Sequence, residues 1–172
     1  MLKRLGSKLK TDSHTTGQSK RTCKTCKKSL ALTRFELDKR TDRRLHNCIA
    51  CRNSGKNKKM TESPYAYLNH LYSQLKYRRK KTHDFTITND YLHYLWRKHK
   101  GVCRYSGKKM THIKDGTGYH LGNVSIDRID NTKGYVKGNI ALVCLAINMM
   151  KYTLELKELI EWCKLIATNN KD

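Results

Sequence analysis

The sequence predicts an α+β fold, with helices around a short two-stranded hairpin and a small cysteine-rich module ahead of them. Three observations support this class. Apolar residues recur at helical spacing in several segments, one stretch alternates extended runs with glycine-rich turns, and four cysteines stand in two close pairs near the N-terminus. Because the chain has 172 residues, of which 37% are hydrophobic, its core must be small.

Three helices are predicted from caps and periodicity. Ser63 precedes a proline and starts a helix that ends in the basic run 76–81. Thr88 caps a second helix, which ends near Gly101. A third is expected over about 154–168, with acidic residues in its first turn. The residues expected to be buried on this third helix are Leu156, Leu159, Ile160, Cys163 and Ile166.

The chain is expected to consist of four segments. They are a flexible basic arm over residues 1–20, a four-cysteine module over 21–53, a polar linker (54–63) and basic helix within 54–84, and the domain that holds the hairpin and the last helix over 85–172.

The charge of the chain is strongly positive. It has 37 Lys and Arg residues against 14 Asp and Glu, a formal net charge of +23. So dense a charge repels itself unless a polyanion is near, and nucleic acid is the natural partner because each neutralised phosphate releases counterions. No apolar run is long enough to span a bilayer and the N-terminus lacks an apolar signal core. The sequence therefore predicts a cytosolic protein with no membrane partner, and it leaves the oligomeric state open.

Two Cys-x-x-Cys pairs, Cys23 with Cys26 and Cys48 with Cys51, indicate a metal site. In a reducing compartment such pairs bind metal rather than form disulfides. Two pairs complete the four-thiolate site of structural zinc, whose binding would supply the folding energy of so small a module. We therefore expect one structural zinc ion per chain in a zinc-ribbon-like module.

Basic residues between these pairs and at the end of the first helix are expected to contact DNA phosphates. They are Arg34, Arg40, Arg43, Arg44, Lys76, Arg78, Arg79 and Lys80. The alternative for the loop between the cysteine pairs is an ordinary solvated surface.

The stretch 123–151 contains two hard oxygen ligands, Asp127 and Asn148, which stand 21 residues apart. We predict a strand over 124–129, a tight turn, a second short strand over 135–136, then a loop and a helix. A hairpin packed on a helix would bring Asp127 close to Asn148, and such ligands suit magnesium or manganese. Spacing alone does not establish the site, because pairs of Asp and Asn are common.

Residues 85–165 resemble the HNH endonuclease family, in a variant that reads Asp-Arg-Ile-Asp from Asp127, Lys-Gly-Tyr up to Tyr135, and then Asn139 and Asn148 ahead of a lysine. The resemblance implies a ββα-metal fold, in which a hairpin and a helix hold one divalent ion. By the same resemblance Asp127 and Asn148 are the metal ligands, and Asn139 ties the loop before the helix to the hairpin.

The sequence departs from the family at the general base, which is usually a histidine directly after the metal-binding aspartate. Arg128 stands there, and arginine stays protonated and cannot take a proton from water. The variant resembles one in which a tyrosine replaces the histidine, which makes Tyr135 the first candidate. His120 is the alternative, because an imidazole accepts a proton readily near neutral pH.

Many HNH proteins hold a further zinc ion with two more Cys-x-x-Cys pairs, and here only half of each pair is present. Cys103 and Cys144 are the first cysteines of these pairs, and Ser106 and Ile147 stand in the places of the second cysteines. These residues cannot complete a zinc site, so we expect the two cysteines to pack as small hydrophobic residues, and Cys163 to be plain core.

Charge, cysteines and the resemblance together predict a magnesium- or manganese-dependent endonuclease that cuts or nicks duplex DNA, of the phage-borne or homing type. A restriction endonuclease of the same variant is the close alternative. A non-catalytic zinc DNA-binding protein and a basic zinc protein bound to RNA fit the charge and the cysteines, but neither requires the set formed by Asp127, Tyr135, Asn139 and Asn148.

Overall fold

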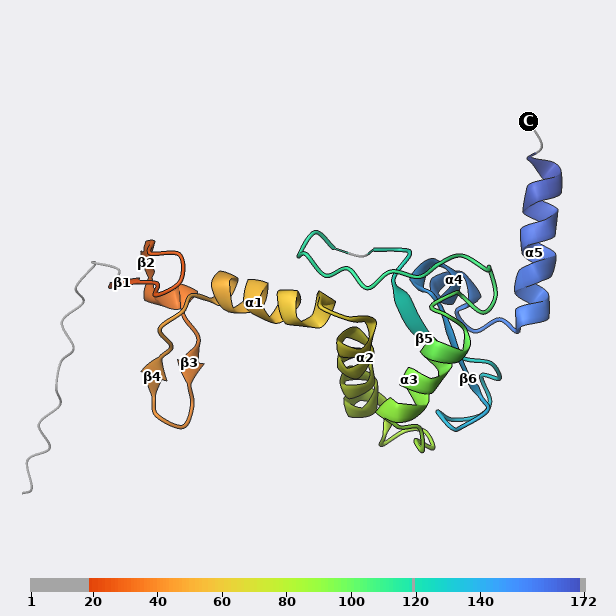
Figure 1. The fold of residues 1–172 in the computed structure, drawn as a ribbon, viewed down its shortest axis with the longest axis horizontal. Helices are drawn as coiled ribbons and strands as arrows, with labels where there is room; N and C mark the ends of the chain where they lie inside the picture. Colours follow the sequence, from red (N-terminus) through yellow and green to blue (C-terminus); the bar gives the residue numbers. More distant parts are fainter. Residues whose placement is uncertain (1–18, 119, 171–172) are drawn as a thin grey trace, which may run out of the picture. The chain divides into compact units, whose positions relative to one another are not determined.

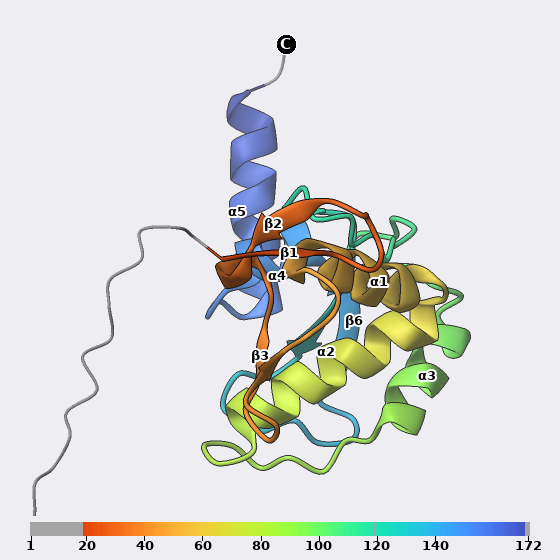
Figure 2. The same ribbon diagram turned by 90° about the vertical axis from the view of Figure 1, so that its left-hand side faces the viewer.

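The computed structural model describes residues 19–118 and 120–170, and the chain divides into two compact units, Met1–Asn53 and Ser54–Asp172. We call them the N-terminal and C-terminal units and describe each by itself (Figures 1 and 2). The arm expected over residues 1–20 lies almost wholly outside the described residues. Helices and small antiparallel sheets make up the described chain, which confirms the α+β class. No helix among these residues is long and apolar enough to cross a membrane.

The N-terminal unit is built from two short antiparallel hairpins and the start of a helix. Its elements are β1 (Lys20–Thr22), β2 (Ser29–Ala31), the 3-10 turn η1 (Leu32–Arg34), β3 (Leu37–Asp38), β4 (Arg43–Arg44) and α1 (Ile49–Thr61). Its cluster of buried hydrophobic residues consists of Cys23, Phe35 and Cys48. A core of this size does not stabilise a fold by itself.

Helix α1 differs from what the sequence predicted for this segment. It runs to Thr61 and therefore takes in most of residues 54–63, which were expected to form a polar linker. None of its residues is buried, so no apolar periodicity marked it in the sequence. Lys58 and Lys59 stand in its last turn, where they interact favourably with the helix dipole.

The C-terminal unit surrounds a single hairpin with helices (Figure 1). Its elements are α2 (Pro64–Arg79), α3 (Asn89–Lys98), β5 (Val124–Arg128), β6 (Ile140–Cys144), α4 (Leu145–Lys151) and α5 (Leu156–Asn169). The predicted caps are confirmed, since the Ser63 hydroxyl accepts from the Ala66 N–H at 3.1 Å and the Thr88 hydroxyl from the Tyr91 N–H at 3.2 Å.

The hairpin pairs β5 with β6 in a register from Val124 opposite Cys144 to Arg128 opposite Ile140. The prediction of a second strand at 135–136, with helix beginning soon after, was wrong. The run Ile-Ala-Leu-Val-Cys is apolar on both faces, and periodicity does not separate a buried strand from a buried helix in so short a run. Tyr135 lies instead in the loop 129–139 and forms a parallel bridge with Phe85.

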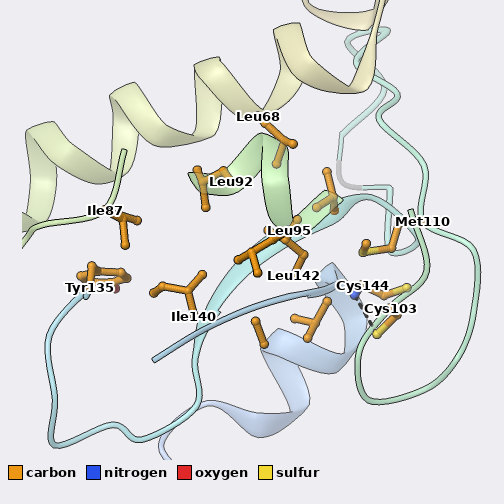
Figure 3. Close-up of a cluster of buried hydrophobic side chains, with 13 residues drawn as sticks. Leu68, Ile87, Leu92, Leu95, Cys103, Met110, Tyr135, Ile140, Leu142 and Cys144 are labelled. Atoms are coloured by element: carbon orange, nitrogen blue, oxygen red, sulfur yellow. Dashed lines mark hydrogen bonds between the residues drawn. The ribbon is translucent and has the colours of Figure 1, made fainter. Parts of the chain in front are cut away.

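The core lies between the hairpin and the helices α2 and α3, while α4 packs on the other side of the hairpin (Figure 3). Leu68 and Leu92 enter from α2 and α3 and meet Leu142 of β6. Cys103 and Cys144 lie together at one end of this cluster, and Tyr135 lies at the other (Figure 3). The core is therefore continuous along the hairpin.

Helix α5 is largely uncovered, contrary to the prediction. Among its five expected core residues only Leu159 is buried, and Leu156 is partly buried. Ile160, Cys163 and Ile166 are exposed, and both views show α5 extending away from the hairpin (Figures 1 and 2). The apolar spacing predicted full burial correctly only at Leu159, and α4 is the element with the most contacts to α5.

Candidate functional site

Asp127 stands on β5, where its side chain is held by two groups from other elements. Its Oδ2 accepts a hydrogen bond from the Tyr105 hydroxyl at 3.0 Å, and its Oδ1 lies 3.3 Å from the Lys151 ammonium. Lys151, at the end of α4, is fully buried and also donates to the Arg128 carbonyl at 2.9 Å. A buried ammonium is tolerated only when it is paired and hydrogen-bonded, so Asp127 and Lys151 fix the end of α4 against β5.

Asn148 stands one turn before Lys151 on α4 and reaches the same strand. Its side-chain N–H donates to the Ser125 hydroxyl at 2.7 Å and to the Ile126 carbonyl at 3.4 Å. The amide oxygen of Asn148 has no hydrogen bond within the part of the chain that the structure describes. Ser125 and Asp127 are two positions apart on β5, so their side chains lie on the same face of the strand. On this face Ser125 contacts Asn148 of α4, and Asp127 contacts Lys151 of α4.

Asn139 is buried in the loop that joins the two strands. Its side-chain N–H groups donate to the carbonyls of Asp130 and Gly134, both at 3.0 Å, and its oxygen accepts from the Asp130 N–H at 2.9 Å. These three bonds close the turn that precedes Tyr135. Asn139 therefore shapes the loop and makes no contact with Asp127 or Asn148 among its hydrogen bonds.

Tyr135 is buried where this loop crosses the segment before α3. The Tyr135 N–H donates to the Asp84 carbonyl at 2.7 Å. The preceding residue must be glycine, since a Cβ at Gly134 would lie 2.3 Å from that same carbonyl oxygen. The close approach leaves the Tyr135 ring 7% exposed.

Two side chains pack against the ring of Tyr135. The guanidinium of Arg128 lies 5.3 Å from the ring centroid and also donates to the Lys133 carbonyl at 3.0 Å. The ring of His83 meets it edge-on at 5.7 Å between centroids. Burial, aided by the charges of Arg128 and Arg79, lowers the pKa of His83.

A groove follows the outer edge of β5 opposite α2, in two adjoining hollows. The first hollow has a volume of about 260 Å³. Its polar lining consists of Gln74, Arg78, Arg79, Ser125, Tyr135 and Asn148. Ser125 and Ile126, the two residues that precede Asp127 on β5, line the hollow, but Asp127 itself does not. The structure thus brings Tyr135 and Asn148, 13 positions apart in the sequence, onto one surface with two arginines.

The second hollow, of about 460 Å³, shares Leu71, Gln74, Arg78 and Ser125 with the first. His120 lines this second hollow and lies 3.0 Å from Asp115 through its Nε2 atom. Hydrogen bonds from Thr117 and then from His120 hold the pKa of Asp115 well below its usual range. The two candidate bases therefore lie in neighbouring hollows, with Tyr135 in the one that Asn148 lines.

The four N-terminal cysteines lie together, as the sequence predicted. Their sulfur atoms are all within 4.8 Å of one another. The Cys48 N–H donates to the Cys23 sulfur at 3.3 Å and is the main cause that lowers the pKa of the Cys23 thiol to about 6. The neighbouring Cys48 thiol, together with burial, raises the pKa of Cys51 to about 12. Four sulfurs this close become thiolates together only around a cation, and the arrangement fits tetrahedral zinc with bonds of about 2.3 Å.

The basic residues predicted to contact DNA differ in their surroundings. Arg44 is partly buried and donates to the Phe35 carbonyl at 2.8 Å, so its guanidinium braces the N-terminal unit. The other seven are exposed. They are Arg34, Arg40, Arg43, Lys76, Arg78, Arg79 and Lys80.

Cys103 and Cys144 are buried in the core of the C-terminal unit, and the Cys144 N–H donates to the Cys103 sulfur at 3.2 Å. Within the described residues, the only group of three or more potential ligands of the His, Cys, Asp and Glu types is the N-terminal one. The packing of these two cysteines as small hydrophobic residues agrees with the sequence prediction. Cys163 was expected to lie in the core, and this prediction was wrong, because the residue is exposed.

Several residues of the site were not recognised in the sequence. Lys151 stands three positions after Asn148, which places both on one face of a helix, so this spacing was an available signal. Tyr105 and His83 offered no such signal, because their contacts with Asp127 and Tyr135 join segments that no local pattern relates.

Comparisons with known proteins give two similarities, and no protein-family description matches the chain. An uncharacterized 29.0 kDa protein from the dda-modA intergenic region of Enterobacteria phage T4 is 32% identical over 89 residues, which are 52% of this chain and 33% of that protein. The chain thus spans about a third of the length of this relative. The structure of the rare-cutting HNH restriction endonuclease PacI aligns with 87% of this chain and 94% of its own, at 20% identity and a TM-score of 0.42.

Proposed function

We propose that the chain is a metal-dependent DNA endonuclease of the HNH type, which hydrolyses phosphodiester bonds in duplex DNA. The observation that carries this proposal is the first hollow, where Tyr135 and Asn148 share one surface with Arg78 and Arg79. A proton acceptor, a metal-ligating oxygen and two phosphate-binding guanidinium groups then face one space. A protein that only binds DNA requires the cations but neither of the other two groups.

The donor atoms of Asp127 and Asn148 fit a magnesium or manganese ion. Each carboxylate oxygen of Asp127 accepts a single hydrogen bond and so keeps a lone pair, and the amide oxygen of Asn148 accepts none in the described part of the chain. When bound there, the ion would polarise the phosphate and stabilise the leaving oxygen. Tyr105 and Lys151 would keep the Asp127 carboxylate in place between β5 and α4.

The protein groups would divide the hydrolysis between binding and proton transfer. Arg78 and Arg79 bind the scissile phosphate and orient it in the hollow. The deprotonated oxygen of Tyr135 takes a proton from water as the water oxygen forms its bond to phosphorus. The bond from phosphorus to the 3′ oxygen breaks, and that oxygen takes a proton from solvent. Arg128, whose guanidinium lies over the Tyr135 ring, holds the ring in place through a cation–π contact.

Asn148→Ala tests the metal site, with Ser125→Ala as its matched control. Asn148→Ala should abolish magnesium- or manganese-dependent cutting of plasmid and leave duplex affinity unchanged in buffer without these ions. Ser125→Ala removes the partner of the Asn148 side chain but no proposed ligand, so it should cut at a rate near that of the wild type. Asp127→Ala should also abolish cutting, but it strands the buried Lys151 and needs a parallel folding measurement. Cutting by Asn148→Ala at the wild-type rate would remove the assignment.

Tyr135→Phe and His120→Ala distinguish the two candidate bases. Tyr135→Phe deletes only a hydroxyl, so the single-turnover rate should fall by about 10²–10⁴-fold with metal and DNA affinity unchanged. His120→Ala should cost about tenfold, equivalent to one lost phosphate contact of about 1.4 kcal/mol. Both variants should be measured at several pH values. If His120→Ala is inactive and Tyr135→Phe cuts normally, His120 is the base.

For the biological role, we propose a nuclease of the phage-borne or homing type, and the identity with the phage T4 protein supports the phage-borne origin. Sequencing the ends released from a cleaved plasmid library separates these roles. A single rare site, or a nick in one strand, supports the homing type. Short palindromic sites cut on both strands would support the restriction alternative.

A further inference from the structure

The second hollow of the groove is lined by positive charge without a partner. Four basic side chains line it, His70 and Arg78 from α2 and Lys114 and His120 from the loop that precedes β5. No acidic residue is among the described residues that line it. The nearby carboxylate of Asp115 is already bonded to Thr117 and His120. Among the described residues that line the hollow, Lys114 and Arg78 therefore have no acidic counter-charge.

His70 adds an independent observation. Its Nε2 atom is buried and has no hydrogen-bond partner among the described residues. Lys114 and Arg78 line the same hollow as His70, and burial, followed by the charges of these two residues, lowers the pKa of His70. Buried polar atoms in native proteins are nearly always paired, so the Nε2 atom of His70 is available to a partner that enters the hollow.

We propose that this hollow binds a second phosphate of the DNA strand, adjacent to the one held in the first hollow. A phosphate oxygen accepts from the Nε2–H of His70, and the charge of the phosphate is compensated by Lys114 and Arg78. The amide of Gln74 offers a further donor. Since Gln74 and Arg78 line both hollows, one strand passes from one into the other along α2. Because the ligand is taken to be DNA, this proposal rests on the proposed function.

Lys114→Met tests the site through the salt dependence of binding, with Arg97→Met as the control. Arg97 is an exposed cation on α3 that does not line the hollow. The affinity for a fluorescent duplex is measured at several salt concentrations, without magnesium, manganese or chelator, so that zinc stays bound and no cutting occurs. Loss of one phosphate contact should lower the slope of log affinity against log salt by about 0.9, and Arg97→Met should change it far less. Equal slopes for both variants would overturn the site.

His70 provides a second readout that does not depend on charge. His70→Leu should weaken binding by a few-fold to about tenfold at unchanged salt slope, and His70→Gln, whose amide still donates, should restore most of it. Equal binding by His70→Leu and the wild type would also overturn the site. A wild type that binds but does not cut would refute the nuclease and leave the phosphate site standing. A wild type that does not bind duplex DNA would refute both.

Discussion

Cysteines have opposite roles in the two units of this chain. In the N-terminal unit, four of them lie within 4.8 Å of one another and the buried hydrophobic cluster contains only one residue that is not a cysteine, Phe35. In the C-terminal unit, Cys103 and Cys144 take part in a core of thirteen buried residues. The first unit gathers its sulfurs into a cluster that fits a metal ion, and the second buries its sulfurs among apolar side chains.

The difference teaches that a bound metal ion and a hydrophobic core are alternative ways to stabilise a small folded unit. A metal site stabilises a module that has too few apolar residues to fold alone. Where α2, α3 and the hairpin already bury a continuous core, half of a cysteine motif is enough, because the sulfur contributes by packing. Three predictions follow from this contrast.

Cys48→Ser should have the largest effect. We expect it to release zinc and unfold the N-terminal unit, since structural zinc contributes about 10–16 kcal/mol in comparable peptides. The C-terminal unit should keep its stability. Both tryptophans, Trp96 and Trp162, lie in the C-terminal unit, so their fluorescence reports its unfolding alone. Elemental analysis and amide hydrogen exchange report the zinc content and the N-terminal unit.

Cys163→Ser is the matched control for Cys48→Ser. Cys163 is exposed on α5, so its substitution should change neither the zinc content nor the urea midpoint of the tryptophan signal. The contrast between the units would be broken if Cys48→Ser lowered that midpoint as much as it loosened the N-terminal unit.

Lys151→Met should have the next largest effect, this time in the C-terminal unit. It leaves the Asp127 carboxylate buried with only the Tyr105 hydroxyl as partner, and breaking a buried ion pair costs about 3–5 kcal/mol. Lys133→Met removes an exposed ion pair with Asp130 and should cost less than about 1 kcal/mol. Urea unfolding followed by tryptophan fluorescence measures both. Similar midpoints for the two variants would show that Lys151 does not hold the site together.

The sequence was informative where its signal was local. The caps at Ser63 and Thr88, the strand that carries Asp127, and the four-cysteine cluster depend on neighbouring residues, and all were predicted correctly. The second strand and the exposure of α5 were not predicted correctly. An apolar run indicates that a segment tends to be buried, but it does not indicate which element covers the segment.

The candidate site was likewise predicted in part from the sequence. The position of Asn148 on a helix that packs against the strand of Asp127 followed from the motif. The groove did not, because it is formed by α2, β5 and the loop 129–139, which are distant in the sequence. Tyr135 reaches the groove from this loop and not from a second strand, so its place was predicted for the wrong structural reason.

Cys103→Ser should have the smallest effect and sharpens the comparison most. The side chain is 1% exposed and accepts the Cys144 N–H, so a hydroxyl keeps an acceptor but places a more polar group among apolar neighbours. We expect a loss of about 1–2 kcal/mol in the unfolding of the C-terminal unit. The zinc content should stay at one ion per chain, because Ser106 and Ile147 complete no site with these cysteines. If elemental analysis gave two zinc ions in the wild type and one in Cys103→Ser, both units would use their cysteines as ligands, and the contrast between them would disappear.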